Sequence, residues 1–222
     1  MFGRLRLTKI HAKFLESCRS LREGKASLGD VTGFPRWLLE IASPAPLLSL
    51  HPEGKRLLSG LEWLEANCRT RPLGEESIRN YHKLLSPLEG RDGGRYRSGR
   101  MQVASSAVQR PPPERVPALM KQLDRKLAQD QKELDAASPD LEPVLQAAVA
   151  VHQRIAFIHP FPDGNGRVAR LSLNHLLRRY GQGYVILPPI SESREHFELL
   201  EKAHLGELGP FLEFARSHLH RL

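Results

Sequence analysis

The strongest constraint on the fold of this chain is a short stretch, residues 159–170, that reads HPFPDGNGRVAR. Its first half contains two prolines and two glycines, which oppose a continuing helix. Apolar segments with helical spacing lie on either side, at residues 141–158 and 167–180. The stretch is therefore predicted to form a loop that two helices hold rigidly at its ends.

The rest of the chain is also predicted to be mainly helical. Apolar side chains recur three and four residues apart in several segments, which glycines and prolines separate. These segments are residues 8–21, 54–68, 75–85, 116–127, 193–204 and 210–220. Only residues 101–103 and 184–187 are predicted to be extended. The prolines at 111–113 close the first of them, because proline lacks the donor that a strand ladder requires.

Composition limits the class of protein. The chain has 222 residues, enough for one large domain or for one domain with a small appendage. Its 40% hydrophobic and 26% charged residues are ordinary for a globular protein. The formal net charge of +8 favours an anionic partner, without distinguishing a nucleotide from a nucleic acid or a membrane.

The cysteine content and the terminal segment bear on the compartment. Cys18 and Cys68 are the only cysteines, which excludes a disulfide-stapled secreted fold and a cysteine-built zinc site. The sequence contains no apolar run long enough to span a membrane, and no signal peptide is recognised at its start. We therefore expect a cytoplasmic protein with no membrane partner.

The glycines of the 159–170 loop suit anion binding. Gly164, Asn165 and Gly166 tolerate positive φ, so that successive backbone N–H groups can converge at the start of the following helix. Arg167 and Arg170 lie three residues apart on the first turn of that helix and can face the same anion. This combination predicts a cradle for a polyphosphate.

Two further side chains of the loop suggest chemistry at that polyphosphate. A carboxylate at Asp163 fits such a positive site when a divalent cation bridges it to the phosphates. His159, with an ordinary pKa of about 6.5, can accept a proton at neutral pH. A lone histidine is more often structural, but a base beside a metal ligand and a phosphate cradle indicates phosphoryl or nucleotidyl transfer.

The loop resembles the signature His-Pro-Phe-x-(Asp/Glu)-Gly-Asn-Gly-Arg-x-x-Arg of the Fic (Fido) family of protein adenylyltransferases at every defined position. Other segments look like the family's remaining helices and its flap: residues 81–85, 94–97, 111–113, 116–120 and 194–211. The resemblance implies a mainly α Fic fold, a bundle of about seven or eight helices with a short β-hairpin flap over the active-site loop. It assigns residues 60–222 to the Fic domain and leaves 1–59 as an N-terminal helical extension, a candidate for regulation.

The resemblance also implies roles for individual residues. His159 would be the general base for a Ser, Thr or Tyr hydroxyl of a target protein, Phe161 a loop anchor, and Asp163 the ligand of Mg²⁺ or Mn²⁺. Asn165 and the surrounding amides would hold the α-phosphate of ATP, Arg167 the β-phosphate and Arg170 the γ-phosphate. The nucleotide-binding positions are Gly164, Asn165, Gly166, Arg167, Arg170, Phe197 and His204.

One departure from the family pattern, at His204, leaves the donor open. Phe197 can stack on a nucleobase, but His204 replaces an amide, so ATP is the first choice and UTP, GTP and CTP remain alternatives. Gly164, in place of the alanine of other branches, favours nucleotidyl over phosphoryl or phosphocholine transfer, and removal of AMP is a further alternative. A basic nucleic-acid-binding or regulatory protein without catalysis is less favoured, because no helix-turn-helix or RNA-stacking motif is seen.

The expected partners follow from the same resemblance. A target protein would dock on the flap, residues 101–113, by adding a strand to it. Family members are commonly inhibited through a glutamate in Ser/Thr-x-x-x-Glu-Gly/Asn, for which Glu23 and Glu53 are imperfect candidates here. The third alternative is that a separate inhibitory protein restrains the enzyme, or that nothing does.

Overall fold

The computed structural model describes residues 52–86, 93–103, 106–137, 139–187 and 193–220. Seven α-helices and one short 3₁₀-helix, Pro113–Arg115, lie within these ranges. The α-helices are α4 (Pro52–Asn67), α5 (Glu75–Leu85), α6 (Val116–Ala137), α7 (Leu141–Ile158), α8 (Asn165–Arg179), α9 (Arg194–His204) and α10 (Leu208–Ser217). The predicted mainly helical bundle is therefore confirmed, and no described helix is long and apolar enough to cross a bilayer.

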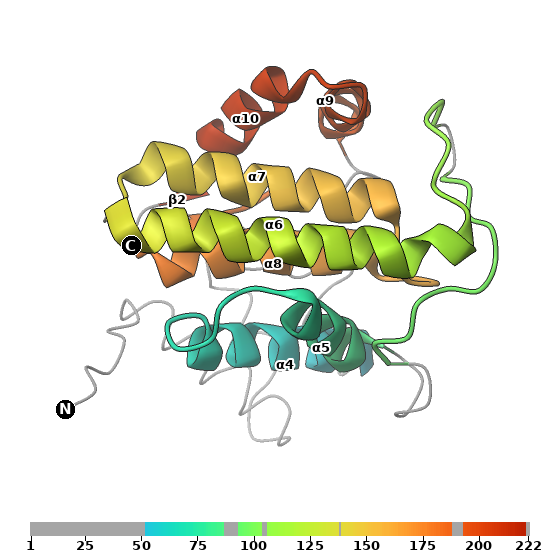
Figure 1. The fold of residues 1–222 in the computed structure, drawn as a ribbon, viewed down its shortest axis with the longest axis horizontal. Coiled ribbons are helices and arrows are strands. Elements are labelled where there is room, and N and C mark those ends of the chain that lie inside the picture. The colour runs from blue at the N-terminus through green and yellow to red at the C-terminus, as the bar shows by residue number, and fades with distance from the viewer. Residues whose placement is uncertain (1–51, 87–92, 104–105, 138, 188–192, 221–222) are drawn as a thin grey trace, which may run out of the picture.

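Three helices form the centre of the bundle. Helices α6, α7 and α8 lie side by side, and short connections reverse the chain between them (Figure 1). Helices α4 and α5 pack on α8 at one side, whereas α9 and α10 pack on α7 at the other. Because successive central helices run in opposite directions, the end of α7, the start of α8 and the segment before α6 meet at one end of the bundle.

The central position of α7 and α8 follows from their sequences. In α7 the buried pairs 144/145, 148/149, 151/152 and 155/156 repeat at the helical period and form one continuous buried side of the helix. In α8 twelve of fifteen residues are buried, including polar ones. Polar groups at such positions need hydrogen-bond partners, because leaving them unpaired costs about 1–3 kcal/mol each.

One of these polar residues ties the C-terminal segment to α8. Strand β1 (Tyr184–Val185) pairs antiparallel with β2 (Leu219–His220). The Asn174 side chain of α8 donates to the Val185 carbonyl over 2.9 Å and accepts from the Val185 N–H over 2.8 Å. The predicted extended segment at 184–187 thus forms a short strand beside the helix that carries the loop.

The flap differs from the expected β-hairpin. Within its described residues, 101–103 and 106–113, no strand is formed. Prolines 111–113 cannot donate to a ladder, and side chains bind the flap backbone instead: Arg97 donates to the Pro111 carbonyl and Glu201 accepts from the Ala107 N–H. The flap is therefore an extended segment fixed by side-chain contacts.

Two boundaries also differ from expectation. Helix α6 continues to Ala137, ten residues beyond the predicted end at 127, because Gln131 and Leu134 extend its buried face. Helix α4 runs through the proposed division between residues 59 and 60, so that this division, which remains a prediction, falls inside a helix. The predicted helix at residues 8–21 lies outside the described residues.

Candidate active site

His159 ends helix α7 in a left-handed conformation. Its φ of 50° makes it the one non-glycine residue with positive φ in the part of the chain that the structure describes. Its N–H still donates to the Ile155 carbonyl over 2.9 Å, and Pro160 prevents the helix from continuing. Such a conformation costs roughly 1–2 kcal/mol for an L-residue, so surrounding contacts must hold it.

Arg97 supplies those contacts. Its buried guanidinium donates to the His159 carbonyl over 2.7 Å and to the Gly99 carbonyl over 2.8 Å. Its own N–H donates to the Pro160 carbonyl over 2.9 Å. The glycine- and arginine-rich composition around it is typical of a solvated loop, so only the family-like segment 94–97 pointed to this buried role.

The environment of His159 favours a neutral imidazole. Burial lowers its pKa below the ordinary 6.5; the Ala156 carbonyl and Asp163 oppose this shift, while Arg110 and Arg97 reinforce it. A neutral ring at neutral pH has a nitrogen lone pair that can accept a proton. His159 therefore has the protonation state that a general base needs.

The anchor of the loop is Phe161, as expected. Its buried ring stacks on His82 with centroids 4.0 Å apart, and the His82 Nδ1 accepts from the Gly94 N–H. The Asn165 side chain accepts from the Phe161 N–H over 2.9 Å and donates to its carbonyl over 2.8 Å. The Asn165 side-chain amide is thus used within the loop. We therefore expect its backbone N–H, and not its side chain, to make the predicted phosphate contact.

The start of α8 presents unpaired positive charge. Gly164, with φ of 74°, precedes the helix, whose first N–H groups have no intrahelical partner. Burial, reinforced by Arg167, lowers the pKa of Arg170 to about 10. The Arg170 Nε has no hydrogen bond, and no ion pair to Arg170 is seen within the described residues. A buried guanidinium without an anion predicts that an anion binds there.

A divalent cation fits beside this cradle. Asp163 forms an ion pair with Arg167 over 3.0 Å, yet its side chain remains 78% exposed. No group of three histidine, cysteine or acidic side chains that could enclose a metal occurs among the described residues. One accessible carboxylate suits Mg²⁺, which commonly takes its other ligands from phosphate oxygens and water.

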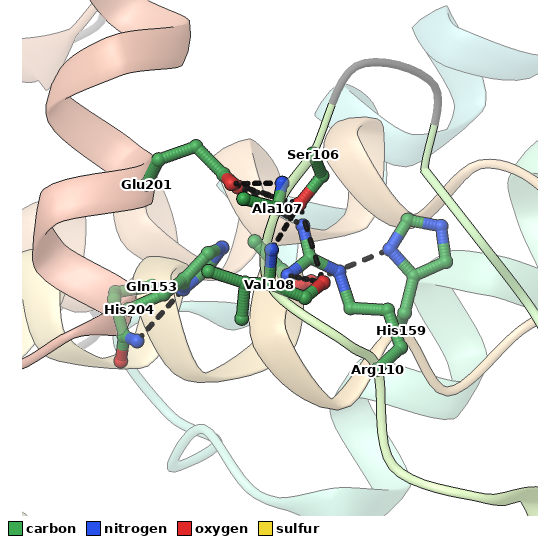
Figure 2. A network of polar contacts seen from close by, with 9 residues as sticks. Ser106, Ala107, Val108, Arg110, Gln153, His159, Glu201 and His204 are labelled. Atoms are coloured by element: carbon green, nitrogen blue, oxygen red, sulfur yellow. Dashed lines mark hydrogen bonds and ion pairs between the residues drawn. The ribbon is translucent and has the colours of Figure 1, made fainter.

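The predicted nucleobase residues lie on α9. Phe197 and His204 are seven residues apart and share one helical face with Glu201. His204 lies beside the loop: the Gln153 Nε2 is 2.9 Å from its Nδ1, and burial, followed by Arg110, lowers its pKa to about 4. The structure thus brings His204 toward His159 (Figure 2). Phe197 is assigned to the same site only because it lies on the same face of α9 as His204.

Two charged residues at this site were not singled out from the sequence. Arg110 of the flap points toward the His159 ring, and Glu201 of α9 pairs with Arg110 (Figure 2). Neither belongs to the signature loop, and their sequence separation of 91 residues hides the pair. Only the fold brings them together.

The remaining candidates have separate outcomes. His175 of α8 is buried, and its Nδ1 and Nε2 lie 2.7 Å from the Tyr81 hydroxyl and 2.9 Å from the Arg71 carbonyl. His152 is buried as well. Glu23 lies outside the described residues, as does the side chain of Glu53, whose backbone belongs to the first turn of α4. Inhibition through either glutamate stays a prediction.

Comparison with known proteins identifies the class of this helical bundle with its phosphate cradle. Residues 72–177 match the sequence model of the Fic/DOC family. This range contains α5, the flap, α6, α7, the loop and most of α8. Just under half of the chain therefore matches a Fic/DOC family domain.

Named relatives and a solved structure agree with this assignment. Protein adenylyltransferase fic-1 of Caenorhabditis elegans is 40% identical over 84 residues, 38% of this chain and 16% of the relative. Protein adenylyltransferase Fic of Drosophila melanogaster is 34% identical over 134 residues, 60% of this chain and 25% of the relative. The chain thus spans only a sixth to a quarter of these proteins. A Fic domain containing signaling protein from Bacteroides thetaiotaomicron has a similar fold, with a TM-score of 0.63, 22% identity and coverage of 92% and 93% of the two chains.

Proposed function

We propose that this chain is a protein adenylyltransferase, which transfers AMP from ATP to a Ser, Thr or Tyr hydroxyl of a target protein. The names of the relatives support this class of reaction. The observation that carries the proposal is the pairing of two groups at one end of the bundle: a neutral, half-buried His159 and a buried Arg170 without an anion.

The proposed reaction is a displacement at the α-phosphorus. The His159 imidazole accepts the proton of the target hydroxyl, and the hydroxyl oxygen forms a bond to the α-phosphorus. The bond between this phosphorus and the oxygen that leads to the β-phosphate breaks, and pyrophosphate leaves with its electron pair. The products are an AMP-modified side chain and pyrophosphate.

The charges of α8 would stabilise this displacement. The N–H groups at Gly164, Asn165 and Gly166 would hold the α-phosphate, while Arg167 and Arg170 would neutralise the β- and γ-phosphates. A magnesium ion bound at Asp163 would supply additional positive charge at the α- and β-phosphates. Asp163 would then exchange its exposed contact with Arg167 for the metal.

The nucleobase preference is the open part of this proposal. Phe197 would stack on the base, and His204 would contact its edge in place of the family's amide. The His204 Nδ1 lies beside Gln153 and its pKa is low, so that the ring is neutral at pH 7. ATP is the proposed donor, and transfer from UTP, GTP or CTP is the second candidate because of this histidine.

Two kinds of partner belong to the proposal. The target would lie along the flap, residues 101–113, close to His159. A glutamate that occupies the Arg170 site would block the γ-phosphate, and Glu23, Glu53 or a separate inhibitory protein could provide it. We propose a cytoplasmic location for the reaction, because ATP is abundant there.

The test compares ATP labelled at the α-phosphate with ATP labelled at the γ-phosphate. Incubated with a cell lysate and Mg²⁺, the protein should transfer the α-label and leave the γ-label in pyrophosphate. His159→Ala should lower labelling by roughly 10²–10⁴-fold. His218→Ala is the control, because His218 caps α10 away from the loop. Transfer of the γ-label would indicate a kinase, and equal labelling by wild type and His159→Ala would refute the assigned base.

A further inference from the structure

The flap and helix α9 meet at a single carboxylate, Glu201. The Ser106 hydroxyl lies 2.8 and 2.9 Å from its two oxygens, and the Ala107 N–H donates to it over 3.2 Å. Arg110 approaches the same carboxylate over 3.4 Å. Figure 2 shows this contact between the helix and the extended flap segment.

These contacts are sheltered from water. The side chain of Arg110 is 3% exposed and that of Glu201 is 16% exposed. Burial lowers the pKa of Arg110, and the contact with Glu201 opposes this shift. A charge-assisted contact in such surroundings is stronger than a surface ion pair, and removing one partner leaves the other charge buried.

The flap depends on this carboxylate because it lacks a strand ladder in its described part. The Ser106 hydroxyl also accepts from the Val108 N–H over 3.2 Å, so that Glu201 fixes a short run of backbone through one side chain. At the other end of this run, Arg110 points toward the His159 ring (Figure 2). The position of Glu201 therefore determines where the flap lies relative to the proposed base.

Helix α9 also places Glu201 beside the proposed nucleobase-binding residues. Phe197 and His204 lie on the face of α9 that also carries Glu201. If these two residues contact the nucleobase, a shift of α9 on nucleotide binding reaches the flap through Glu201. Between the described flap residues and α9 no backbone hydrogen bond is formed, so that one side chain then couples the two.

We propose that Glu201 is a positioning residue: it fastens the flap to α9 and thereby sets the target-docking segment and Arg110 against His159. The expected effect of Glu201 on catalysis rests on the proposed adenylyl transfer. The attachment of the flap to α9 by Glu201 does not depend on that proposal. We assign Glu201 no direct role at the nucleotide or the reacting atoms: it acts through Ser106, Ala107 and Arg110.

The first experiment measures hydrogen–deuterium exchange of the full chain. Glu201→Ala should accelerate exchange at residues 106–110 by about tenfold, because it removes the acceptor of the Ala107 N–H and of the Ser106 hydroxyl. Glu201→Gln keeps an acceptor but removes the charge, so it should accelerate exchange less. The matched control is Glu198→Ala, on the same helix, whose carboxylate binds only the exposed Arg194 among the described residues. Equal exchange in wild type and Glu201→Ala would overturn the proposal.

The second experiment separates positioning from nucleotide binding. In Glu201→Ala the affinity for Mg²⁺ with a non-hydrolysable ATP analogue should stay within about threefold, while α-label transfer to lysate proteins falls about tenfold or more. Glu201→Gln should restore part of the transfer, and Glu198→Ala should match wild type. Faster flap exchange with unchanged transfer would overturn the positioning role. If the wild-type protein transfers no label at all, the proposed function fails, while the exchange comparison still decides whether Glu201 fastens the flap.

Discussion

Two buried arginines of the same helix, Arg170 and Arg178, face opposite electrostatic surroundings. Arg178 donates to both oxygens of the buried Glu65 over 2.9 and 3.1 Å. Although burial lowers the pKa of Arg178, the contact with Glu65 outweighs it and raises the value. Arg170, two turns earlier in α8, has no anionic partner within the described residues, and burial lowers its pKa to about 10.

The charge of Arg178 stabilises the fold, whereas the charge of Arg170 is available to a ligand. At the Arg178 end, the hydroxyl of Tyr184 also donates to Glu65, and the network joins α4, α8 and β1. At the Arg170 end, the positive charge lies beside a glycine turn and a helix N-terminus, both suited to an anion. Burying a charge without a partner is costly, so its retention at the loop indicates a bound partner rather than a role in stability.

The largest expected effect tests this contrast through stability. Arg178→Gln leaves the Glu65 carboxylate buried without its cation and should lower the free energy of unfolding by about 3–5 kcal/mol. Arg170→Gln removes an unpaired buried charge and should change it by less than about 1 kcal/mol, or raise it. Denaturant titration measures both. Similar losses in the two variants would show that Arg170 is also structural.

Nucleotide affinity should respond in the opposite order. Arg170→Gln should weaken binding of Mg²⁺ with a non-hydrolysable ATP analogue about 100-fold, equivalent to about 2.7 kcal/mol. Arg170→Lys should fall between, because lysine keeps the charge without the planar fork. Arg178→Lys, measured under conditions where it is folded, is the control and should bind within about threefold of wild type. Calorimetry gives the dissociation constants, and unchanged affinity in Arg170→Gln would remove Arg170 from the cradle.

The anion site at the Arg170 end of α8 could be predicted from the sequence, whereas the ion pair at the Arg178 end could not. The chemistry of the loop is local: glycines, arginines and a histidine within twelve residues specify an anion site without knowledge of the fold. The helices that flank it, 75–85 and 141–158, were predicted at their observed bounds, because apolar periodicity is also local.

What the sequence missed depends on distant contacts. Glu65 and Arg178 are 113 residues apart, and Arg110 and Glu201 are 91 apart. No spacing rule connects such pairs before the helices are packed. The hairpin flap was expected from the family resemblance, whereas the side chains that hold the observed extended flap, Arg97 and Glu201, lie outside it in the sequence.

The buried histidine of α8, His175, should make the stability of the fold depend on pH. His175, near the paired end, is fully buried, and burial lowers its pKa from 6.5 to about 4. As the pH falls, His175 of the unfolded chain binds a proton near pH 6.5, whereas His175 of the folded chain binds one only near pH 4. His175 therefore destabilises the fold as pH falls through this window, by about 2.5 kcal/mol between pH 7 and pH 4.5.

The measurement compares wild type with His175→Gln, which keeps an acceptor and a donor for Tyr81 and Arg71. The buried His152 and the half-buried His204 titrate in both proteins, so the difference between the two stability–pH curves isolates His175. The variant should lose less stability on acidification by about 2.5 kcal/mol. Parallel curves would mean that His175 is not a neutral, buried group.

The smallest expected effect concerns Asp163 and the metal. Its ion pair with Arg167 is largely exposed, and pairs of this kind contribute about 0.3–0.5 kcal/mol, so Asp163→Asn should leave the free energy of unfolding nearly unchanged. Nucleotide binding should change instead. In wild type, a chelator that removes Mg²⁺ should weaken binding of the ATP analogue about tenfold, or about 1.4 kcal/mol, because the metal joins the carboxylate to the phosphates. In Asp163→Asn the same chelator should have little effect. An equal loss in both proteins would mean that Asp163 does not bind the metal, and that the loop holds the nucleotide through α8 and its arginines alone.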